Sequence, residues 1–579
     1  MKRVLIANRG EIAVRIIRAC AAYGLESVAV YADPDAEALH VQLADRAYAL
    51  EGTTALETYL DVDKILQVAA QSGADAVHPG YGFLSERADF ASAVERAGLL
   101  WIGPTPENIA LLGDKVEARR IAAQVGAPLV PGTPDPVEGV EQVKAFADQY
   151  GYPIAIKAAF GGGGRGLKVV RDHQELARRY ESAVSEARSA FGRGECYVER
   201  FVERPRHVEA QIIGDGRGRI VVAGTRDCSV QRRHQKIVEE APAPFLTKSQ
   251  RDAIVAASIA IGQAVEYRGV GTMEFMLGQD GELSFLEVNT RIQVEHPITE
   301  RTTGLDLVAL QFRIAEGGNL NDLPDVVPAD GHAFEFRLTA EDPGRGFLPQ
   351  AGQITRFDTP GGPGVRVEAG VASGGKVPAQ FDSMVAKIIC WGQTREEALA
   401  RSRQALKETR VEGLPTLIGF HRRLLEDPAF AATGAHDFTI HTGWLESDCD
   451  WLDQLKQSLP RQIGATRVLR QFLEVDGRWI RLGLPAELLG QQAAGFGDAS
   501  GTGGSEEPAE GDIRAPMTGI LSRWLANDDD QVTAGDPIAI LEAMKMETRI
   551  VAGRSGVLTR LVAKEGATVR DGQVIGRID

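Results

Sequence analysis

Cysteine is scarce in this sequence, and its spacing argues against two structural roles. Five cysteines occur among 579 residues, and no two of them form a CxxC pair. A disulfide framework or a zinc site needs cysteines at short, regular spacing, so we expect neither. Free cysteines are typical of a reducing compartment, and the sequence therefore predicts a cytoplasmic protein.

Long hydrophobic runs and an excess of positive charge are also lacking. No run reaches the roughly 18 apolar residues of a membrane-spanning helix, and the N-terminus, MKRVLIANRG, has no long apolar segment of a signal peptide. Lys and Arg number 64 against 80 Asp and Glu, a net charge of −16. Nucleic-acid-binding proteins carry the opposite balance. We therefore expect neither a membrane span nor a nucleic-acid partner.

The rest of the composition is typical of a large globular protein. Apolar residues make up 44% and charged residues 25% of the chain, which favours buried cores over disorder. A length of 579 residues corresponds to roughly four domains of about 150 residues. Glycine, with 64 residues, exceeds its usual share of about 7%, which indicates glycine-rich loops.

The N-terminal part alternates strand-like and helix-like segments. Apolar runs at 3–7, 27–31 and 76–79 predict strands, and apolar residues at helical spacing predict a helix over 11–22. This βαβ pattern is typical of a doubly wound domain, which we place at residues 1–113. Gly10 alone is a weak phosphate signal, and a plain strand-to-helix turn explains it as well.

The remaining chain divides into five further parts. Two α/β segments are expected over 114–330 and 331–445. In a small docking segment, 446–490, two strand-like runs flank Asp476-Gly477, a strong hairpin signal. One hairpin is too small to stand alone, so it should pack on a neighbour or partner. Residues 491–511, rich in Gly, Ser and Ala without periodicity, predict a flexible linker before a final domain at 512–579.

The final domain contains an internal repeat. Gly519, Val532 and Gly535 recur 37 positions later as Gly556, Val569 and Gly572. Several matches at one offset predict two similar halves built of short strands and tight turns. Gly566 has Asp529 as its counterpart, and Asp tolerates positive φ well enough to keep the turn.

A lysine marks the centre of this repeat. The midpoint of Gly519 and Gly572 is 545.5, next to Lys545 in Ala543-Met544-Lys545-Met546. A solvated turn lysine between two core methionines would look similar in isolation. Its position at the pseudo-symmetry centre instead favours an amine displayed for modification.

Two more segments suggest phosphate and metal chemistry. Lys157 follows an apolar run and precedes Gly161-Gly162-Gly163-Gly164, whose backbone N–H groups could wrap phosphate oxygens, although a plain flexible loop is the alternative. Read as a strand, residues 285–295 place on one face Phe285, Glu287, Asn289, Arg291, Gln293 and Glu295. These oxygens suit Mg²⁺, and Glu274 lies one short hairpin away. A half-buried strand with a solvated polar face would look similar.

Longer motifs now identify a resemblance. Ala543-Met544-Lys545-Met546 resembles the biotinylation motif of biotin carboxyl carrier domains, with lipoyl domains as nearest relatives. Residues 1–445 resemble the biotin carboxylase branch of the ATP-grasp family, through ANRGEIA at 7–13, HPGYGFLSE at 78–86, QRRHQK at 231–236 and NTRIQVEHP at 289–297. The resemblance implies an α/β (α+β) multidomain fold. It comprises a Rossmann-like preATP-grasp domain, an ATP-grasp domain, a biotin carboxylase C-terminal domain and an all-β biotinyl domain, a flattened barrel of the hammerhead type.

The resemblance also implies a set of site residues. For ATP these are Lys115, Lys157, Gly163, Gly164, Glu199, Arg200, Phe201, Val202, His207, His234, Glu274 and Glu287. Mg²⁺ or Mn²⁺ would be held by Glu274, Glu287 and Asn289. Lys236, Arg291 and the Val294 backbone would bind bicarbonate, with Glu295 as base and Arg337 on the biotin oxyanion. Biotin itself would be attached to Lys545.

The implied activity is a two-stage biotin carboxylation. Bicarbonate and ATP give carboxyphosphate, and CO₂ is then trapped on biotin. The chain has no room for a carboxyltransferase, so it resembles the α subunit of an acetyl- or propionyl-CoA carboxylase. A separate carboxyltransferase β subunit, a biotin protein ligase and a second copy through the carboxylase part are the implied partners. The alternatives are a 3-methylcrotonyl-CoA carboxylase α subunit, a carrier-only scaffold with an inactive ATP site, and another ATP-grasp ligase carrying lipoate.

Overall fold

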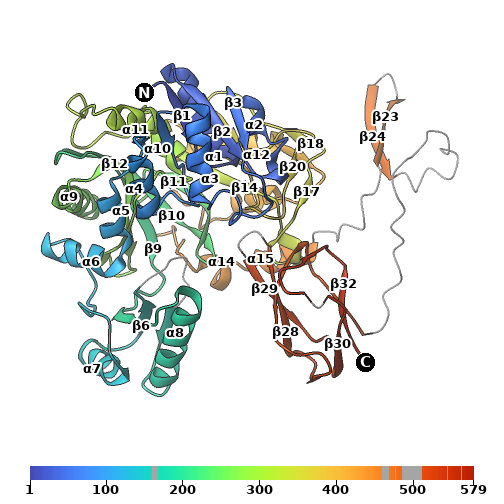
Figure 1. The fold of residues 1–579 in the computed structure, drawn as a ribbon. Coiled ribbons are helices and arrows are strands. Elements are labelled where there is room, and N and C mark those ends of the chain that lie inside the picture. The colour runs from blue at the N-terminus through green and yellow to red at the C-terminus, as the bar shows by residue number, and fades with distance from the viewer. Residues whose placement is uncertain (160–166, 459–467, 476–477, 486–510, 544–545, 563) are drawn as a thin grey trace. The chain divides into compact units, whose positions relative to one another are not determined.

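The computed structural model describes residues 1–159, 167–458, 468–475, 478–485, 511–543, 546–562 and 564–579 (Figure 1). They fall into two compact units. The first contains Met1–Ala340 and Gly352–Asp450, and the second contains Glu341–Ala351 and Trp451–Asp579. The predicted lid glycines Gly163 and Gly164, the biotinylation candidate Lys545 and almost the whole 491–511 segment lie outside the described residues.

The N-terminal part of the first unit is a parallel five-stranded sheet in the order β3-β2-β1-β4-β5. Its strands are β1 Arg3–Ile6, β2 Glu26–Tyr31, β3 Arg46–Ala49, β4 Ala76–His78 and β5 Leu100–Trp101. The helices around it are α1 Gly10–Tyr23, α2 Leu39–Leu43, α3 Val62–Ser72, α4 Ala88–Arg96 and α5 Pro106–Gly113, with the short η1 Asp33–Asp35. The predicted βαβ pattern is confirmed.

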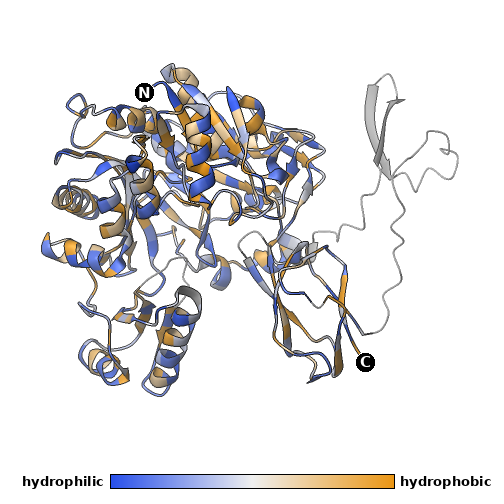
Figure 2. Cartoon of the chain, in the orientation of Figure 1, coloured by the Kyte–Doolittle hydropathy of each residue, from blue (hydrophilic) through white to orange (hydrophobic). Residues whose placement is uncertain are grey.

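Helix α1 shows why this part folds as it does. Ile12, Ile16 and Cys20 recur at helical spacing and are buried against the sheet. The helix ends at Gly24, whose left-handed backbone (φ 80°) caps it. Orange apolar and blue polar segments are interspersed along the ribbon of the described residues (Figure 2).

A smaller α/β layer follows. The three-stranded antiparallel sheet β7-β6-β8 packs against α7 and α8, and these elements form a lobe of their own in Figure 1. The bounds are α6 Lys115–Gln124, α7 Val140–Tyr150, β6 Ile154–Ala158, β7 Leu167–Val170, α8 Leu176–Phe191 and β8 Cys196–Arg200. Lys157 lies on β6, directly before the segment that contains the glycine run.

The centre of the first unit is an eight-stranded sheet in the order β13-β12-β9-β10-β11-β14-β21-β19. Its strands are β9 Arg206–Asp215, β10 Ile220–Arg232, β11 Gln235–Ala241, β12 Arg268–Leu277, β13 Leu283–Asn289, β14 His332–Thr339, β19 Val365–Ala369 and β21 Met384–Gly392. One continuous sheet therefore joins strands on both sides of residue 330. Its helices include α9 Lys248–Ala264, α10 His296–Thr303, α11 Leu307–Ala315 and α12 Arg395–Glu408.

The remaining elements of the first unit are short. They are β17 Gly352–Gln353, β18 Arg356–Asp358, β20 Lys376–Val377, β22 Arg410–Glu412, α13 Ile418–Leu424 and α14 Trp444–Ser447. The second unit contains four further short elements, β15 Glu341–Asp342, η2 Pro343–Arg345, β16 Leu348–Pro349 and α15 Trp451–Ser458. No helix within the described ranges has the length and apolar character needed to cross a membrane.

One predicted strand is longer than the real one. We predicted a strand over 285–295, but β13 ends at Asn289, and Glu295 is the N-cap residue of α10. Pro297 in the first helical turn favours helix initiation there, because its fixed φ suits that position. Arg291, Gln293 and Glu295 therefore project from a loop rather than from one face of a strand.

The C-terminal domain confirms the internal repeat. The domain has two four-stranded sheets, β25-β32-β30-β27 and β29-β28-β26-β31. The 37-residue offset relates each strand of one sheet to the strand at the same place in the other. Their strands are β25 Asp512–Arg514, β26 Gly519–Trp524, β27 Gln531–Val532, β28 Pro537–Ala543, β29 Met546–Val551, β30 Gly556–Arg560, β31 Thr568–Val569 and β32 Val574–Ile578. The core formed by its described residues is apolar, and the enclosed Asp512 carboxylate pairs with Arg514 and Arg577.

The turn that departs from the repeat keeps its geometry. Asp529 has φ 66° and its counterpart Gly566 has φ 82°. The Asp529 amide donates to the Leu558 carbonyl at 2.8 Å, and the Gly566 amide donates to the Leu521 carbonyl at 2.8 Å, the equivalent bond. Asp tolerates the left-handed region, so the predicted substitution is accommodated. The predicted hairpin is also found, as β23 Val468–Val475 paired with β24 Arg478–Pro485.

Candidate active site

Lys236 is the hub of a buried charge cluster in the eight-stranded sheet. From β11, its Nζ donates to Glu209 at 2.7 Å, to Glu274 at 3.0 Å and to Glu295 at 2.7 Å. Burial alone would lower the pKa of this lysine, but the surrounding acids raise it well above its usual value. Lys236 is therefore a fixed cation at the point where three carboxylates meet.

Arg337 is the second cation on Glu295. Its Nη2 donates to Glu295 Oε2 at 2.9 Å, and its Nε donates to Glu239 Oε1 at 2.6 Å. Burial favours protonation of Glu295, but Lys236, Arg337 and Arg226 outweigh it and lower its pKa far below the ordinary range. Glu295 is thus an ionised carboxylate whose two oxygens each accept from a different cation.

Arg226 lies beneath this cluster and orders it. It is fully buried and donates to Glu209, to Gln211 at 2.6 Å and to Gln293 Oε1 at 2.7 Å. Gln293 in turn donates to Glu274 at 3.1 Å. A charged residue this deep requires such partners, and the network fixes the loop that bears Glu295.

The same loop is held from its other side. The Val294 carbonyl accepts from Lys387 Nζ on β21 at 2.8 Å, and Lys387 also pairs with Glu11 at 3.1 Å. Glu11 accepts in addition from the Tyr81 hydroxyl. With its carbonyl engaged, Val294 can offer an anion only its N–H.

Arg291 extends the cluster toward the N-terminal part. Its Nε donates to Glu86 Oε2 at 2.9 Å and its Nη2 to Asn289 Oδ1 at 3.0 Å. Burial lowers the pKa of this guanidinium, but Glu86, together with Glu295 and Glu274, outweighs burial and raises it. Of the residues that the resemblance groups together, Lys236 and Arg337 each contact Glu295 directly, and Arg291 contacts Glu86 and Asn289.

The predicted phosphate-binding cations are each paired with a carboxylate. Lys115 lies 2.8 Å from Glu287, Lys157 contacts Glu199, and His207 Nε2 lies 3.1 Å from Glu274. Burial lowers the pKa of His207, but Glu274 outweighs burial and leaves it raised.

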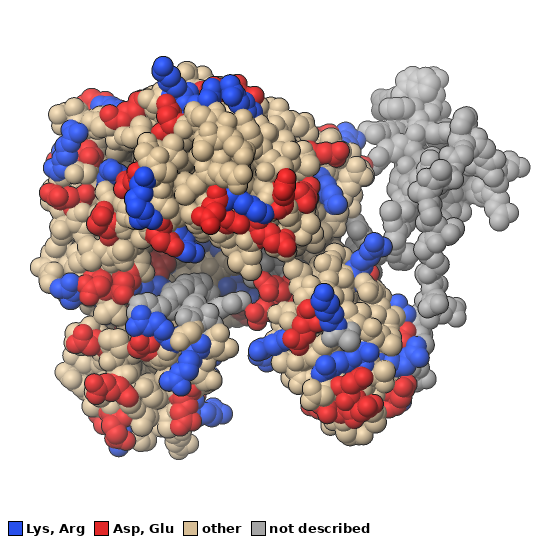
Figure 3. Space-filling view, viewed as in Figure 1, with Lys and Arg blue, Asp and Glu red and all other residues tan. Residues whose placement is uncertain are grey.

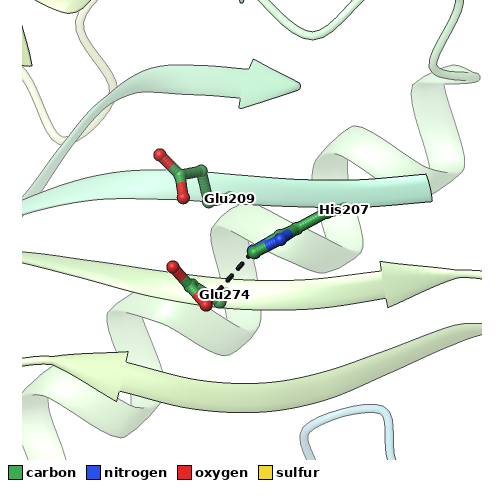
Figure 4. Close-up of side chains that lie close together, drawn as sticks. All are labelled: His207, Glu209 and Glu274. Carbon is green, nitrogen blue, oxygen red and sulfur yellow. Dashed lines mark ion pairs between the residues drawn. The ribbon is translucent and has the colours of Figure 1, made fainter. Parts of the chain in front are cut away.

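The predicted metal ligands lie on adjacent strands. Glu274 on β12 is directly opposite Glu287 on β13 in the register, and the buried Asn289 amide Nδ2 has no partner. Two other sets of close donor atoms occur among the described residues: His207 with Glu209 and Glu274 (Figure 4), and Glu209 with Cys228 and Glu295. The Lys236 ammonium already contacts Glu209, Glu274 and Glu295. The opposed Glu274 and Glu287 offer the carboxylate oxygens that a hard cation prefers, and each of them also contacts a lysine, Lys236 and Lys115 respectively.

Four of the other predicted ATP residues are consecutive at the end of β8. Glu199 and Arg200 end β8, followed by Phe201 and Val202, and Arg119 joins Lys157 on Glu199 at 3.1 Å. His234 is exposed in the turn between β10 and β11, with φ 66°. On the visible face of the described residues, positive and negative side chains are interspersed (Figure 3).

Several residues of the cluster had no predicted role. Glu209, Arg226, Glu239, Glu335 and Lys387 received no role from the sequence. Each lies in a strand, flanked by apolar or uncharged residues except where an acid follows Arg226 and Glu239. A lone charge in an otherwise buried strand is rare and needs a partner, which is the signal that could have identified them.

Family models match nearly the whole chain. They are "Biotin carboxylase, N-terminal domain" over residues 1–109, "Carbamoyl-phosphate synthase L chain, ATP binding domain" over 114–323, "Biotin carboxylase C-terminal domain" over 335–447 and "Biotin-requiring enzyme" over 511–578.

Individual relatives agree with these matches. The biotin-dependent acyl-coenzyme A carboxylase alpha3 subunit of Mycobacterium leprae is 53% identical over 589 aligned positions, covering 100% of this chain and 98% of its own. The biotin carboxylase of Nostoc is 46% identical over 74% of this chain and 96% of its own. The solved biotin carboxylase domain dimer of Hydrogenobacter thermophilus 2-oxoglutarate carboxylase, with MgADP and bicarbonate, superimposes with TM-score 0.73 at 42% identity, covering 77% and 97% of the two chains.

Proposed function

The chain belongs to the biotin-dependent carboxylases, as an α-type chain that joins biotin carboxylase and biotin carrier domains, and from this premise we propose how its residues act and which reaction they serve. It is an ATP-dependent ligase that uses biotin, ATP and Mg²⁺. The proposals concern the residue roles, the acyl group acceptor and the partners.

We propose that Glu295 is the base that takes the proton of bicarbonate. The observation that supports this role is the convergence of Lys236 and Arg337 on its two oxygens. Lys236, Arg291 and the Val294 N–H are the donors for the bicarbonate oxygens. Arg337 stabilises the oxyanion that forms on the biotin ureido group. Charge neutralisation by fixed cations is the main catalytic demand of such a step.

The low pKa of Glu295 makes it a weak base as it stands. The groups that hold its pKa down include Lys236 and Arg337, which are also the groups assigned to substrate. When bicarbonate accepts from Lys236 and biotin from Arg337, each cation shares its charge with substrate, and the pKa of Glu295 rises. Substrate binding thus prepares the base for proton abstraction.

The nucleotide region fits a metal-bound triphosphate. Glu274, Glu287 and Asn289 would hold Mg²⁺ or Mn²⁺, which neutralises phosphate charge when bound. Lys115, Lys157 and His207 would contact the phosphates, with Gly163 and Gly164 above them. Each of these cations pairs with a carboxylate. When a metal–nucleotide complex binds, the phosphates can take the place of the carboxylates beside the cations, and the metal ion can then pair with the released carboxylates. Glu199 to Val202 and His234 are assigned to the nucleoside.

Lys545 is proposed to bear the biotin, attached by a biotin protein ligase. A separate carboxyltransferase β subunit would accept the carboxyl group and pass it to acetyl-CoA, propionyl-CoA or a longer acyl-CoA. The full-length match to an acyl-CoA carboxylase α subunit supports an acyl-CoA acceptor, and 3-methylcrotonyl-CoA is the alternative within that class. Self-association through the carboxylase part is proposed as well, since the matched 2-oxoglutarate carboxylase domain was solved as a dimer.

Purification of the tagged chain from its native host tests the partner proposal. We expect one co-purifying carboxyltransferase chain, with carboxylation of acetyl- or propionyl-CoA above that of 3-methylcrotonyl-CoA. A preference for 3-methylcrotonyl-CoA would replace the proposed substrate class. Bicarbonate-dependent ATP cleavage by the isolated chain tests the ATP site separately, and its absence would favour a carrier-only scaffold.

A further inference from the structure

Glu335 is a buried acid that the proposed reaction does not use. It lies in the middle of β14, and neither of its carboxyl oxygens has a hydrogen-bond partner. In the β11–β14 register it is directly opposite Glu239. The Oε1 of Glu239 accepts from Arg337, while its Oε2 is buried without a partner. Directly opposed residues of neighbouring strands have Cβ atoms about 5 Å apart, so the two unpartnered carboxyl groups are neighbours.

The charges around Glu335 are already committed elsewhere. Its electrostatic neighbours are Lys387 on β21, Glu239 on β11, Arg337 on its own strand and Glu295 before α10. Lys387 is engaged by Glu11 and the Val294 carbonyl, and Arg337 by Glu239 and Glu295. On the helices that pack on β14, Glu300 pairs with Arg15 and Arg395 with Glu240, while His296 contacts the Gln293 carbonyl through Nδ1 and its buried Nε2 has no partner.

An ionised Glu335 would therefore be a buried charge without a cation of its own among the described residues. Burial raises its pKa well above the ordinary value, Lys387 offsets this only in part, and Glu239 adds to it. Burial also raises the pKa of Glu239 to about 7, although Arg337 opposes it. Two adjacent carboxyl groups in such surroundings avoid repulsion by holding one proton between them.

We propose that Glu335 is a carboxylic acid that shares one proton with Glu239 and thereby positions Arg337 against Glu295. The shared proton limits the pair to a single negative charge. Arg337 then has one carboxylate on its Nε side and one on its Nη2 side, which fixes the plane of the guanidinium. Loss of the proton would add a second negative charge beside Nε and draw Arg337 away from Glu295. Glu335 is thus a positioning residue, and the inference rests on the proposed roles of Arg337 and Glu295.

Two variants of the full chain test whether residue 335 acts as a hydrogen-bond donor or as a negative charge. In Glu335→Gln the amide replaces the acid as donor, so kcat for bicarbonate-dependent ATP cleavage at neutral pH should stay within about threefold of wild type, and the alkaline fall of the pH profile should disappear. Glu335→Leu removes the donor, so kcat should fall about tenfold, the worth of one buried hydrogen bond, with KM for ATP unchanged. The matched control is Ile389→Val, opposite Glu335 on β21, which alters packing alone and should leave the pH profile unmoved. A Gln variant as defective as the Leu variant, or with an unaltered alkaline limb, would overturn the proposal.

Infrared difference spectroscopy of wild type against Glu335→Gln tests whether Glu335 is protonated, and it requires no measurement of activity. We expect a protonated-carboxyl C=O band at neutral pH that the variant lacks. Absence of this band would show an ionised Glu335 and refute the proposal even if Glu335→Leu failed to fold. Because the band does not depend on turnover, it also separates this proposal from the roles of Arg337 and Glu295. Those roles fail instead if Arg337→Met retains full activity while the band is present.

Discussion

The carboxylase part and the C-terminal carrier domain differ in how many charged side chains their interiors contain. Around Glu295 the sheet buries Arg226 completely and encloses most of Lys236 and Arg337, with their acids, in one connected network. Within the described residues of 512–579 the core is apolar, and the enclosed Asp512 carboxylate pairs with Arg514 and Arg577 at the surface. The comparison indicates that the first part performs chemistry by fixing charges in a low-dielectric interior. Under the proposed function, the carrier needs only a rigid support for the Lys545 amine.

Removing that amine should have the largest effect. Lys545→Arg keeps the positive charge but removes the primary amine that a biotin ligase acylates. We expect complete loss of biotin from the purified chain, measured by intact mass and streptavidin binding, and complete loss of acyl-CoA carboxylation. ATP cleavage stimulated by free biotin should survive, because the carboxylase network is untouched. Biotin found on another lysine would contradict the assignment.

Removing the negative charge of Glu295 should have the next largest effect. Glu295→Gln preserves shape but removes the base, so turnover should fall by about 10²–10⁴-fold, the usual worth of general base catalysis. ATP binding, measured by calorimetry, should stay near normal because Glu295 contacts none of the proposed phosphate ligands directly. A variant within threefold of wild type would show that another group takes the proton.

Shortening the connection between the two parts should have a moderate effect. The 21 residues of 491–511 have, as a flexible coil, a span of roughly 25 Å, and at full extension at most about 75 Å. Deletion of about twelve of them should spare ATP cleavage with free biotin. The same deletion should depress acyl-CoA carboxylation several-fold in the reconstituted complex, because the carrier must reach a second active site. A Gly/Ser segment of the original length should restore the rate, and an undiminished rate in the shortened chain would disprove the tether.

The smallest effect should come from the carrier turns. Gly566 has φ 82° and open space where a Cβ would lie, so Gly566→Ala should cost only the left-handed backbone penalty, about 1–2 kcal/mol. The matched control, Asp529→Gly at the equivalent turn, should not lower stability. Amide hydrogen exchange of β26 and β30 in the full chain measures both. Equal protection in wild type and Gly566→Ala would mean that the turn does not limit carrier stability.

Local sequence patterns predicted the elements better than the charge network. The N-terminal βαβ pattern, the hairpin of β23 and β24 and the carrier repeat depend on spacings within short segments, and the structure confirms all three. The strand over 285–295 was predicted too long, because period-two alternation continued through residues that the helix start at Pro297 removes from the sheet.

The network itself could be predicted only in part, because it depends on register between distant strands. The family resemblance brought Lys236, Glu295 and Arg337 together, as the structure does. Nothing local indicates that Glu335 is opposite Glu239, 96 positions away, or that Lys387 holds the Val294 carbonyl. Pairings of this kind arise from sheet order, which no segment specifies alone.

The pairing of β11 with β14 also constrains how such a protein can be rearranged during evolution. The family models end at residue 323 and resume at 335, as though the two segments were interchangeable modules. Yet Glu239 and Arg337 stand on opposite sides of that boundary, on neighbouring strands of one sheet. A recombination breakpoint between them would separate Glu239 from the arginine that we propose to act beside the base, so we expect the two segments to be inherited together.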